Sequence, residues 1–333
     1  MRATPLTACL LPCLLAAPLL ALAADGLPAP IVTITEQGGV RTITSNGIPD
    51  HVPGTFPTRG NPNTISAQRY VFRMTTTPAQ TGRLTSHGRN WAGVAVNGVP
   101  FEPGTAEAWK NDPSTGWHIE GIQPAMHGPV LGMDANNAHV QPNGAYHYHG
   151  VPTGLLAKRA AAAGTKVGQT MLLIGWAADG FPIYDFHGYA KADDATSGLK
   201  ELHSSWRLKK GERPGGDAGP GGTYDGTYTE DYEYVAGSGD LDECNGRTGV
   251  TPEFPKGTYY YVVTAEFPFV TRALKGERDP SFTKAGGPGG RRGPGGPGAP
   301  GGPGGRGPGT GGRRGPGGPG GPGAPPPPPG AVP

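Results

Sequence analysis

The sequence predicts a mainly β fold, in which one large β-rich domain carries one short helix. β-branched and aromatic residues gather in short runs bounded by Gly, Pro and Asn, which is typical of strands. These runs occupy residues 31–35, 41–44, 70–74, 171–176 and 258–263. About 260 residues remain between the two chain ends considered below, enough to bury a full hydrophobic core. We therefore expect one domain over residues 24–284.

Two tight turns are predicted inside this domain. Asn97-Gly98 separates two apolar runs within residues 92–101, and Asp179-Gly180 does the same within residues 178–185. Asn-Gly and Asp-Gly favour β-hairpins because these residues tolerate the positive φ angles that a two-residue hairpin turn requires. We expect a strand, a turn and a second strand in each segment.

One helix is predicted after Pro152. Thr153 can cap its first turn, and Gly164 can end it. Four apolar side chains can share one side of this helix: Leu155, Leu156, Ala160 and Ala163.

The segments 143–149 and 256–262 resemble each other. The first reads Asn-Gly-Ala-Tyr-His-Tyr-His and the second Lys-Gly-Thr-Tyr-Tyr-Tyr-Val, and proline and aromatic residues follow each. The second segment has lost both histidines. This echo indicates an internal pseudo-repeat, in which one copy kept the chemistry and the other kept the packing.

The two chain ends have compositions that do not suit a folded domain. Residues 1–23 have a short basic start, an apolar stretch and an Ala-Leu-Ala cleavage site, and so predict a signal peptide and a periplasmic or secreted protein. Residues 285–333 are almost entirely Gly, Pro and Arg, which predicts a disordered tail because little apolar area can be buried. No other segment approaches the roughly 20 apolar residues of a membrane span.

The charge distribution argues against nucleic acid as a partner. The formal net charge is +2, but the tail carries five arginines and no acid, and Arg2 leaves with the signal peptide. The remaining body has 22 basic and 26 acidic residues, a net charge of −4. Phosphate binding needs a concentrated basic face, which such a body does not provide. The tail is interpreted as a solvated tether whose arginines can touch an anionic cell-surface polymer. The oligomeric state is left open.

The segment Tyr146-His147-Tyr148-His149 predicts a metal site. Side chains alternate along a strand, so His147 and His149 project from one face and the two tyrosines from the other. Two imidazoles on one strand face can converge on one divalent transition metal, with copper or zinc as the expected ion. The preceding segment supplies His139 or Asp134 as a third ligand.

A second polar cluster contains Asp242, Glu243 and Cys244. With Asp179, the two carboxylates are candidates for general acid and base, while an acidic turn with local backbone hydrogen bonds is the structural interpretation. Cys244 is the only cysteine left after removal of the signal peptide, so no intramolecular disulfide is expected. It is buried, a metal ligand or paired with another chain.

Common catalytic motifs are absent from the sequence. It has no Gly-x-Ser-x-Gly elbow, Walker loop or dinucleotide fingerprint. Three interpretations therefore remain: a metal-binding exported protein; an exported hydrolase of cell-wall or extracellular polymer, using the carboxylates beside the histidines; or a structural or adhesive surface protein.

Three motifs together resemble the YHYH domain family: residues 146–149, 178–184 and 241–247, in this order. The resemblance covers about residues 94–276 and implies an exported bacterial protein, without implying an activity. This sequence departs from the family that it resembles at three points. The resemblance implies His at the position of Arg247, a second Tyr-His-Tyr-His at 259–262, and cysteines able to pair with Cys244. Residues 271–276 have no cysteine here. The resemblance thus implies a single site, at the first copy.

Overall fold

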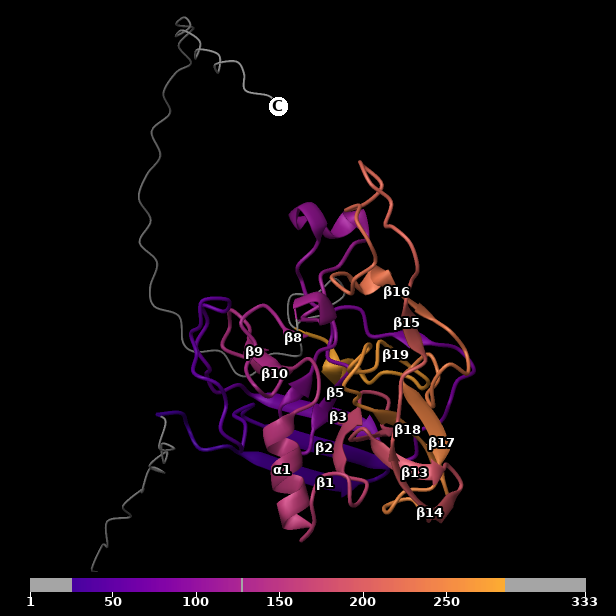
Figure 1. The fold of residues 1–333 in the computed structure, drawn as a ribbon. Coiled ribbons are helices and arrows are strands. Elements are labelled where there is room, and N and C mark those ends of the chain that lie inside the picture. The colour runs from indigo at the N-terminus through magenta and orange to yellow at the C-terminus, as the bar shows by residue number, and fades with distance from the viewer. Residues whose placement is uncertain (1–25, 127, 285–333) are drawn as a thin grey trace, which may run out of the picture. The chain divides into compact units, whose positions relative to one another are not determined.

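The computed structural model describes residues 26–126 and 128–284, which lie in one compact unit. The predicted signal peptide and the predicted tail fall outside the described residues. Within the described part, the fold is mainly β with one α-helix, as the sequence predicts (Figure 1). None of the described helices is long and apolar enough to cross a membrane.

An eight-stranded mixed sheet forms the centre of the fold. Its order is β17-β18-β12-β11-β5-β6-β10-β9. Neighbours are antiparallel except for two parallel pairs, β6 with β10 and β12 with β18. The strands are β5 (Gly93–Ala95), β6 (Pro100–Phe101), β9 (Ala138–Val140), β10 (Tyr146–Tyr148), β11 (Leu173–Ala177), β12 (Pro182–Tyr184), β17 (Gly246–Gly249) and β18 (Thr258–Val262).

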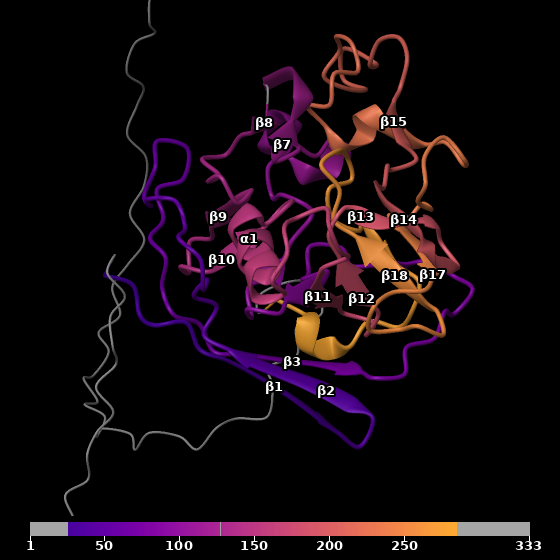
Figure 2. The same cartoon turned by 60° about the horizontal axis from the view of Figure 1, so that its bottom comes forward.

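The sheet consists of two similar four-stranded units joined where β5 meets β11. The order β5-β6-β10-β9 in the first unit is repeated by β11-β12-β18-β17 in the second. β9 and β10 therefore lie on the opposite side of the molecule from β17 and β18 (Figures 1 and 2). The hairpin turns also match, because Ala95 N–H donates to Val99 O at 2.8 Å and Ala177 N–H donates to Phe181 O at 2.9 Å. The pseudo-repeat predicted from the sequence is thus an architectural feature.

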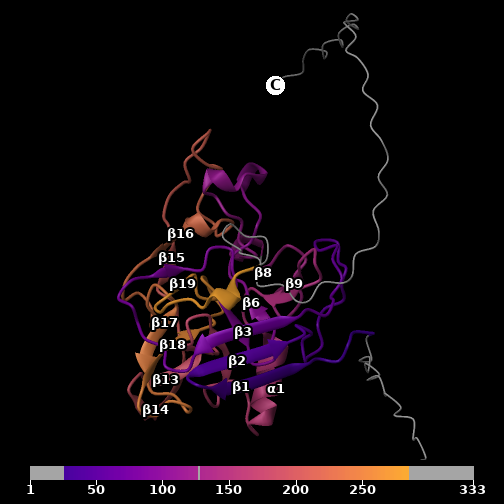
Figure 3. The same ribbon diagram turned by 180° about the vertical axis from the view of Figure 1, so that it is seen from behind.

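A three-stranded antiparallel sheet packs its buried residues into the same core (Figure 3). It contains β1 (Val32–Gln37), β2 (Val40–Ser45) and β3 (Tyr70–Thr75). Alternate residues of β2 and β3 are buried, among them Ile43, Phe72 and Met74, while every residue of β1 is exposed. Phe72 stacks on Phe282 with ring centroids 4.8 Å apart. Because side chains alternate along a strand, one face of this sheet points inward.

Helix α1 (Thr153–Ala162) buries Leu155, Leu156 and Ala160, as predicted, whereas Ala163 is exposed. Thr153 is the first helical residue rather than the cap, and the preceding Pro152 has no side-chain oxygen to offer. Asn136 supplies the acceptor instead, because its Oδ1 atom receives Gly154 N–H at 2.8 Å. Gly164 follows the helix with φ 65°, a left-handed conformation that favours glycine.

The remaining described elements are short and flank the central sheet. Two insertions meet beside each other, one between β6 and β9 and one between β14 and β17, because Glu120 N–H donates to Thr227 O at 2.9 Å. The strand pairs are β4 (Thr85–Ser86) with β19 (Ala273–Leu274), β7 (Ile122–Gln123) with β8 (Gly128–Pro129), β13 (His187–Lys191) with β14 (Asp194–Glu201), and β15 (Trp206–Leu208) with β16 (Tyr232–Tyr234). The 3₁₀ turns are η1 (Trp109–Asn111), η2 (Pro113–Thr115), η3 (Pro124–Met126), η4 (Thr229–Asp231) and η5 (Pro280–Phe282).

Candidate metal centre

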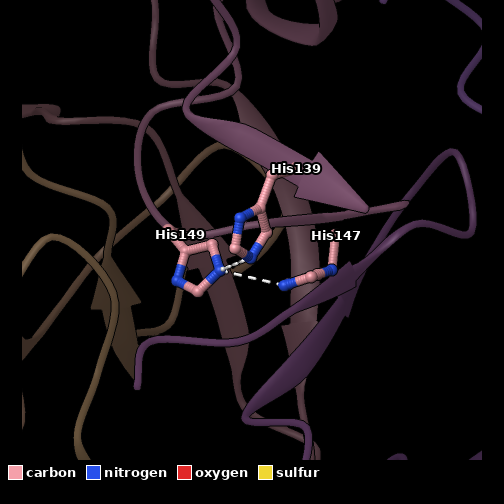
Figure 4. A group of neighbouring side chains, drawn as sticks. All are labelled: His139, His147 and His149. Carbon is pink, nitrogen blue, oxygen red and sulfur yellow. Dashed lines mark hydrogen bonds between the residues drawn. The ribbon is translucent and has the colours of Figure 1, made fainter. Parts of the chain in front are cut away.

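Strands β9 and β10 bring three histidines together at one edge of the central sheet. The antiparallel register places His139 directly opposite His147. His149 follows two residues later, so its side chain returns to the same face. The three imidazoles point toward one another (Figure 4). A third ligand from residues 134–139 was predicted, and the strand register brings the imidazole of His139 to this position.

The Nε2 atoms of the three rings converge. His149 Nε2 lies 2.9 Å from His147 Nε2 and 3.1 Å from His139 Nε2, and one ligand atom from each ring lies within 4.8 Å of the others. Zinc binds imidazole nitrogen at about 2.0–2.1 Å, so two nitrogens on one ion lie roughly 3–3.5 Å apart. The spacing within this three-histidine cluster therefore suits a shared metal ion.

Backbone carbonyls fix the orientation of two of the rings. His147 Nδ1 donates to Ala145 O at 3.0 Å, and His139 Nδ1 donates to Leu131 O at 3.1 Å. Since the proton of each neutral ring is then on Nδ1, the lone pair is on Nε2 and faces the other rings. Such an outer hydrogen bond commonly orients a histidine that ligates a metal. His149 Nδ1 is buried and has no hydrogen-bond partner within the described part of the chain.

Burial keeps these imidazoles neutral. Desolvation lowers the pKa of His139 and lowers the pKa values of His147 and His149 well below the ordinary value. The neighbouring imidazoles lower the last two further, since adjacent positive charges would repel. Neutral rings at neutral pH have the lone pairs that a metal requires.

The tyrosines of β10 occupy the opposite face, as the alternation predicts. The Tyr148 hydroxyl accepts from Asn97 Nδ2 at 3.0 Å and lies 2.6 Å from His51 Nε2. Because His51 Nδ1 faces Val52 O at 3.2 Å, the ring accepts from the tyrosine at Nε2. His51 therefore supports the strand that carries the cluster, a role that no local sequence pattern indicated.

Asp134 lies among these supporting groups and is not part of the three-histidine cluster. Its Oδ2 atom accepts from the Tyr146 hydroxyl at 2.6 Å and from Gly54 N–H at 2.8 Å. Its Oδ1 atom accepts from Asn136 N–H at 2.8 Å and from Ala138 N–H at 3.2 Å. The carboxylate therefore organises the loop that enters β9.

A pocket of about 870 Å³ extends from the surface to the three histidines, all of which line it. Buried Glu102 also lines it, with Oε2 3.4 Å from His147 Nε2. Gln141 Nε2 donates to the same oxygen at 2.6 Å, while Lys284 forms an ion pair with Oε1. Burial raises the pKa of Glu102, and Lys284 opposes this shift. Sequence reasoning missed Glu102, although a carboxylate directly after an apolar hairpin strand was an available signal.

The second unit keeps the scaffold of the site but has different side chains at its centre. The β17–β18 register places Arg247 opposite Tyr260, as His139 is opposite His147. Arg247 Nε donates to the Tyr260 hydroxyl at 2.6 Å, and Val262 occupies the position that corresponds to His149. A cation and a phenol thus replace the imidazoles, and this position has no metal ligands corresponding to them.

The candidate acid and base residues lie in this second unit. Asp179 accepts from the Tyr261 hydroxyl at 2.6 Å, and Asp242 accepts from the Tyr259 hydroxyl at 3.0 Å. Glu243 accepts from Lys275 Nζ at 2.7 Å. None of the three carboxylates lines the pocket that contains the histidines, and none belongs to the three-histidine cluster. These carboxylates are not brought together with the histidines.

Cys244 is fully buried and is the only cysteine among the described residues. Desolvation raises the pKa of its thiol to about 12, with Asp242 adding to the effect. A protonated thiol is a poor nucleophile and a poor metal ligand. Cys244 therefore serves as a packing residue of the hydrophobic core.

Comparison with known proteins gives one result. Residues 71–276 match the model of a family described as YHYH protein. The match contains all three histidines and both four-stranded units, and begins earlier than the predicted resemblance, within β3. No curated protein and no solved structure gives a significant match.

Proposed function

This chain belongs to the YHYH protein family, and we propose that it is an exported protein that binds one divalent transition-metal ion through His139, His147 and His149. The observation that carries the proposal is the convergence of three neutral Nε2 atoms at the floor of a pocket. The predicted signal peptide supports export to the periplasm or beyond.

The donor set favours copper or zinc. Imidazole nitrogen suits zinc, copper, iron and nickel, whereas magnesium and calcium prefer oxygen ligands. The cluster offers three nitrogens, with no carboxylate or thiol in the group. Three protein ligands also leave a coordination position for water or a substrate, unlike the closed four-ligand sites in which zinc is purely structural. An exchangeable or catalytic ion fits this arrangement better than a structural one.

The two other interpretations have less support. The carboxylate hydrolase requires Asp179, Asp242 or Glu243 to reach a substrate shared with the histidines, and these groups lie in the other unit. The structural or adhesive interpretation requires the histidines to pack without an open pocket, whereas all three line one.

The test is elemental analysis by plasma mass spectrometry on the mature protein from its exported fraction. We expect a near-stoichiometric metal in the unaltered protein and its loss in the His147→Ala/His149→Ala variant. The matched control is His118→Ala/His203→Ala, because neither imidazole belongs to the cluster or lines the pocket.

Circular dichroism establishes that both variants fold, and zinc and copper are added back to any metal-free sample. An unaltered protein that contains no metal and rebinds none contradicts the proposal. The same conclusion follows if the cluster variant and the control variant retain equal metal.

A further inference from the structure

We infer that the pocket above the three-histidine cluster binds a small organic oxyanion, a molecule that carries a carboxylate or phosphate group. The inference deepens the proposed function, on which its metal-dependent part rests. It starts from three residues that line the pocket and have polar groups without a partner among the described residues: Arg69, Arg89 and Tyr70.

Arg69 and Arg89 are exposed at the mouth of the pocket. Neither side chain has a hydrogen bond or an ion pair with another described residue. The third basic residue that lines the pocket, Lys284, pairs with Glu102. A guanidinium presents a fork of donors that matches the two oxygens of a carboxylate or phosphate. Both arginines are therefore free to bind such a group.

Tyr70 provides a buried donor. Its hydroxyl is inaccessible to solvent and has no hydrogen-bond partner among the described residues. A buried polar group without a partner costs about 1–3 kcal/mol, so a ligand oxygen that accepted this hydrogen bond would relieve the cost. Burial, together with nearby Glu102, raises the pKa of Tyr70 and keeps the hydroxyl protonated. The ring is held in place by Trp91 and Phe72.

The charge of the pocket favours an anion. Three basic side chains and two acidic side chains line it, giving a net charge of +1: Arg69, Arg89 and Lys284 against Glu102 and Glu107. The neutral imidazoles add nothing, and a divalent ion bound to them would raise the sum to +3. Low-dielectric walls strengthen the attraction of such a pocket for an oppositely charged ligand.

The size of the pocket suits a small organic molecule. A volume of about 870 Å³ falls within the roughly 300–1,000 Å³ of small-molecule sites. One oxyanion oxygen can take the coordination position that three histidines leave open, while the others meet donors of the pocket wall. A small organic molecule that carries the oxyanion can fill more of this space than a bare inorganic anion.

The test is isothermal titration calorimetry with acetate and methylphosphonate as probes, on zinc-loaded and zinc-free protein. We expect binding that weakens at least tenfold in the Arg69→Ala/Arg89→Ala variant. The matched control removes two other exposed arginines that do not line the pocket, Arg73→Ala/Arg83→Ala. Tyr70→Phe, which removes only the unpartnered hydroxyl, is expected to weaken binding several-fold without loss of folding.

The metal content of each sample, measured in parallel, separates the two proposals. Arginine-dependent binding to zinc-loaded protein supports both. Arginine-dependent binding to a protein that takes up no metal supports the anion site and contradicts the metal proposal. Failure of both probes to bind, or equal binding by the pocket variant and the control variant, overturns the anion inference whatever the metal content.

Discussion

Tyr146 and His147 are adjacent in the sequence, yet their side chains serve opposite faces of β10. The imidazole joins the three-histidine cluster, whereas the phenol donates to Asp134. The two-residue period of a strand is sufficient to create this division. Each tyrosine hydroxyl of the motif has a partner, so the full burial of the rings does not leave an unsatisfied polar group.

A substitution at Asp134 separates a supporting role from a ligating one. Asp134→Asn weakens the acceptor for Tyr146 and for three backbone N–H groups, so we expect a stability loss of about 1–3 kcal/mol. Zinc affinity should change little, because Asp134 makes no hydrogen bond to any of the three imidazoles, whereas His139→Ala removes one of the three nitrogens and should reduce it far more. Urea unfolding and zinc titration measure the two effects. If the two variants lose similar zinc affinity, Asp134 is a ligand.

The two four-stranded units share a backbone turn but differ in the side chains at their centre. Asn137 and Asn245 both adopt positive φ, at 52° and 58°, and their carbonyls receive His149 N–H and Val262 N–H at 2.8 and 2.9 Å. The backbone of this turn is therefore shared by both units. The difference is confined to side chains, since Arg247 and Tyr260 form a hydrogen bond where the first unit has imidazoles.

Helix α1 depends on an acceptor from the loop before β9. Asn136→Ala removes the acceptor of Gly154 N–H at the start of the helix, so we expect a loss of about 0.5–2 kcal/mol in the free energy of unfolding. Urea unfolding of the unaltered protein and of the variant measures the change. Unaltered stability in Asn136→Ala would show that Asn136 does not contribute a helix cap.

At the level of the whole molecule, the two units of the sheet differ in what they hold at corresponding positions. The first places its histidines beneath a pocket, and the second fills the corresponding position with a hydrogen-bonded Arg247–Tyr260 pair. Buried tyrosines from both units contribute to one continuous hydrophobic core. The second unit therefore contributes to packing without histidines at the corresponding positions.

Buried histidines make the stability of the fold depend on pH. Desolvation, assisted by Arg272, lowers the pKa of His87 to about 3. In the unfolded chain it titrates near 6.5, so below that pH the unfolded state binds a proton that the folded state excludes. The stabilisation is full above pH 6.5 and is lost as the pH falls toward 3.

We expect His87 to account for a stability loss on the order of 2 kcal/mol between pH 7 and pH 5. Urea unfolding of the unaltered protein and of His87→Gln at both pH values measures it. Gln has no proton to take up, so the variant should lose less stability over this range. An identical loss in both proteins would show that His87 does not contribute to the pH dependence.

The sequence alone determined the features that depend on local periodicity and composition. The alternation in residues 146–149 predicted which side chains share a face, Asn-Gly and Asp-Gly predicted two hairpins, and the echo at 256–262 predicted the repeat. Tertiary structure decided what depends on distant segments. It placed His139 rather than Asp134 in the cluster. Strand register puts His139 opposite His147, whereas the Asp134 carboxylate accepts a hydrogen bond from Tyr146 on the other face of the strand. It also brought Glu102, Arg69 and Lys284 to one pocket, which no local pattern encodes because the chain folds these separate segments together only when the core forms.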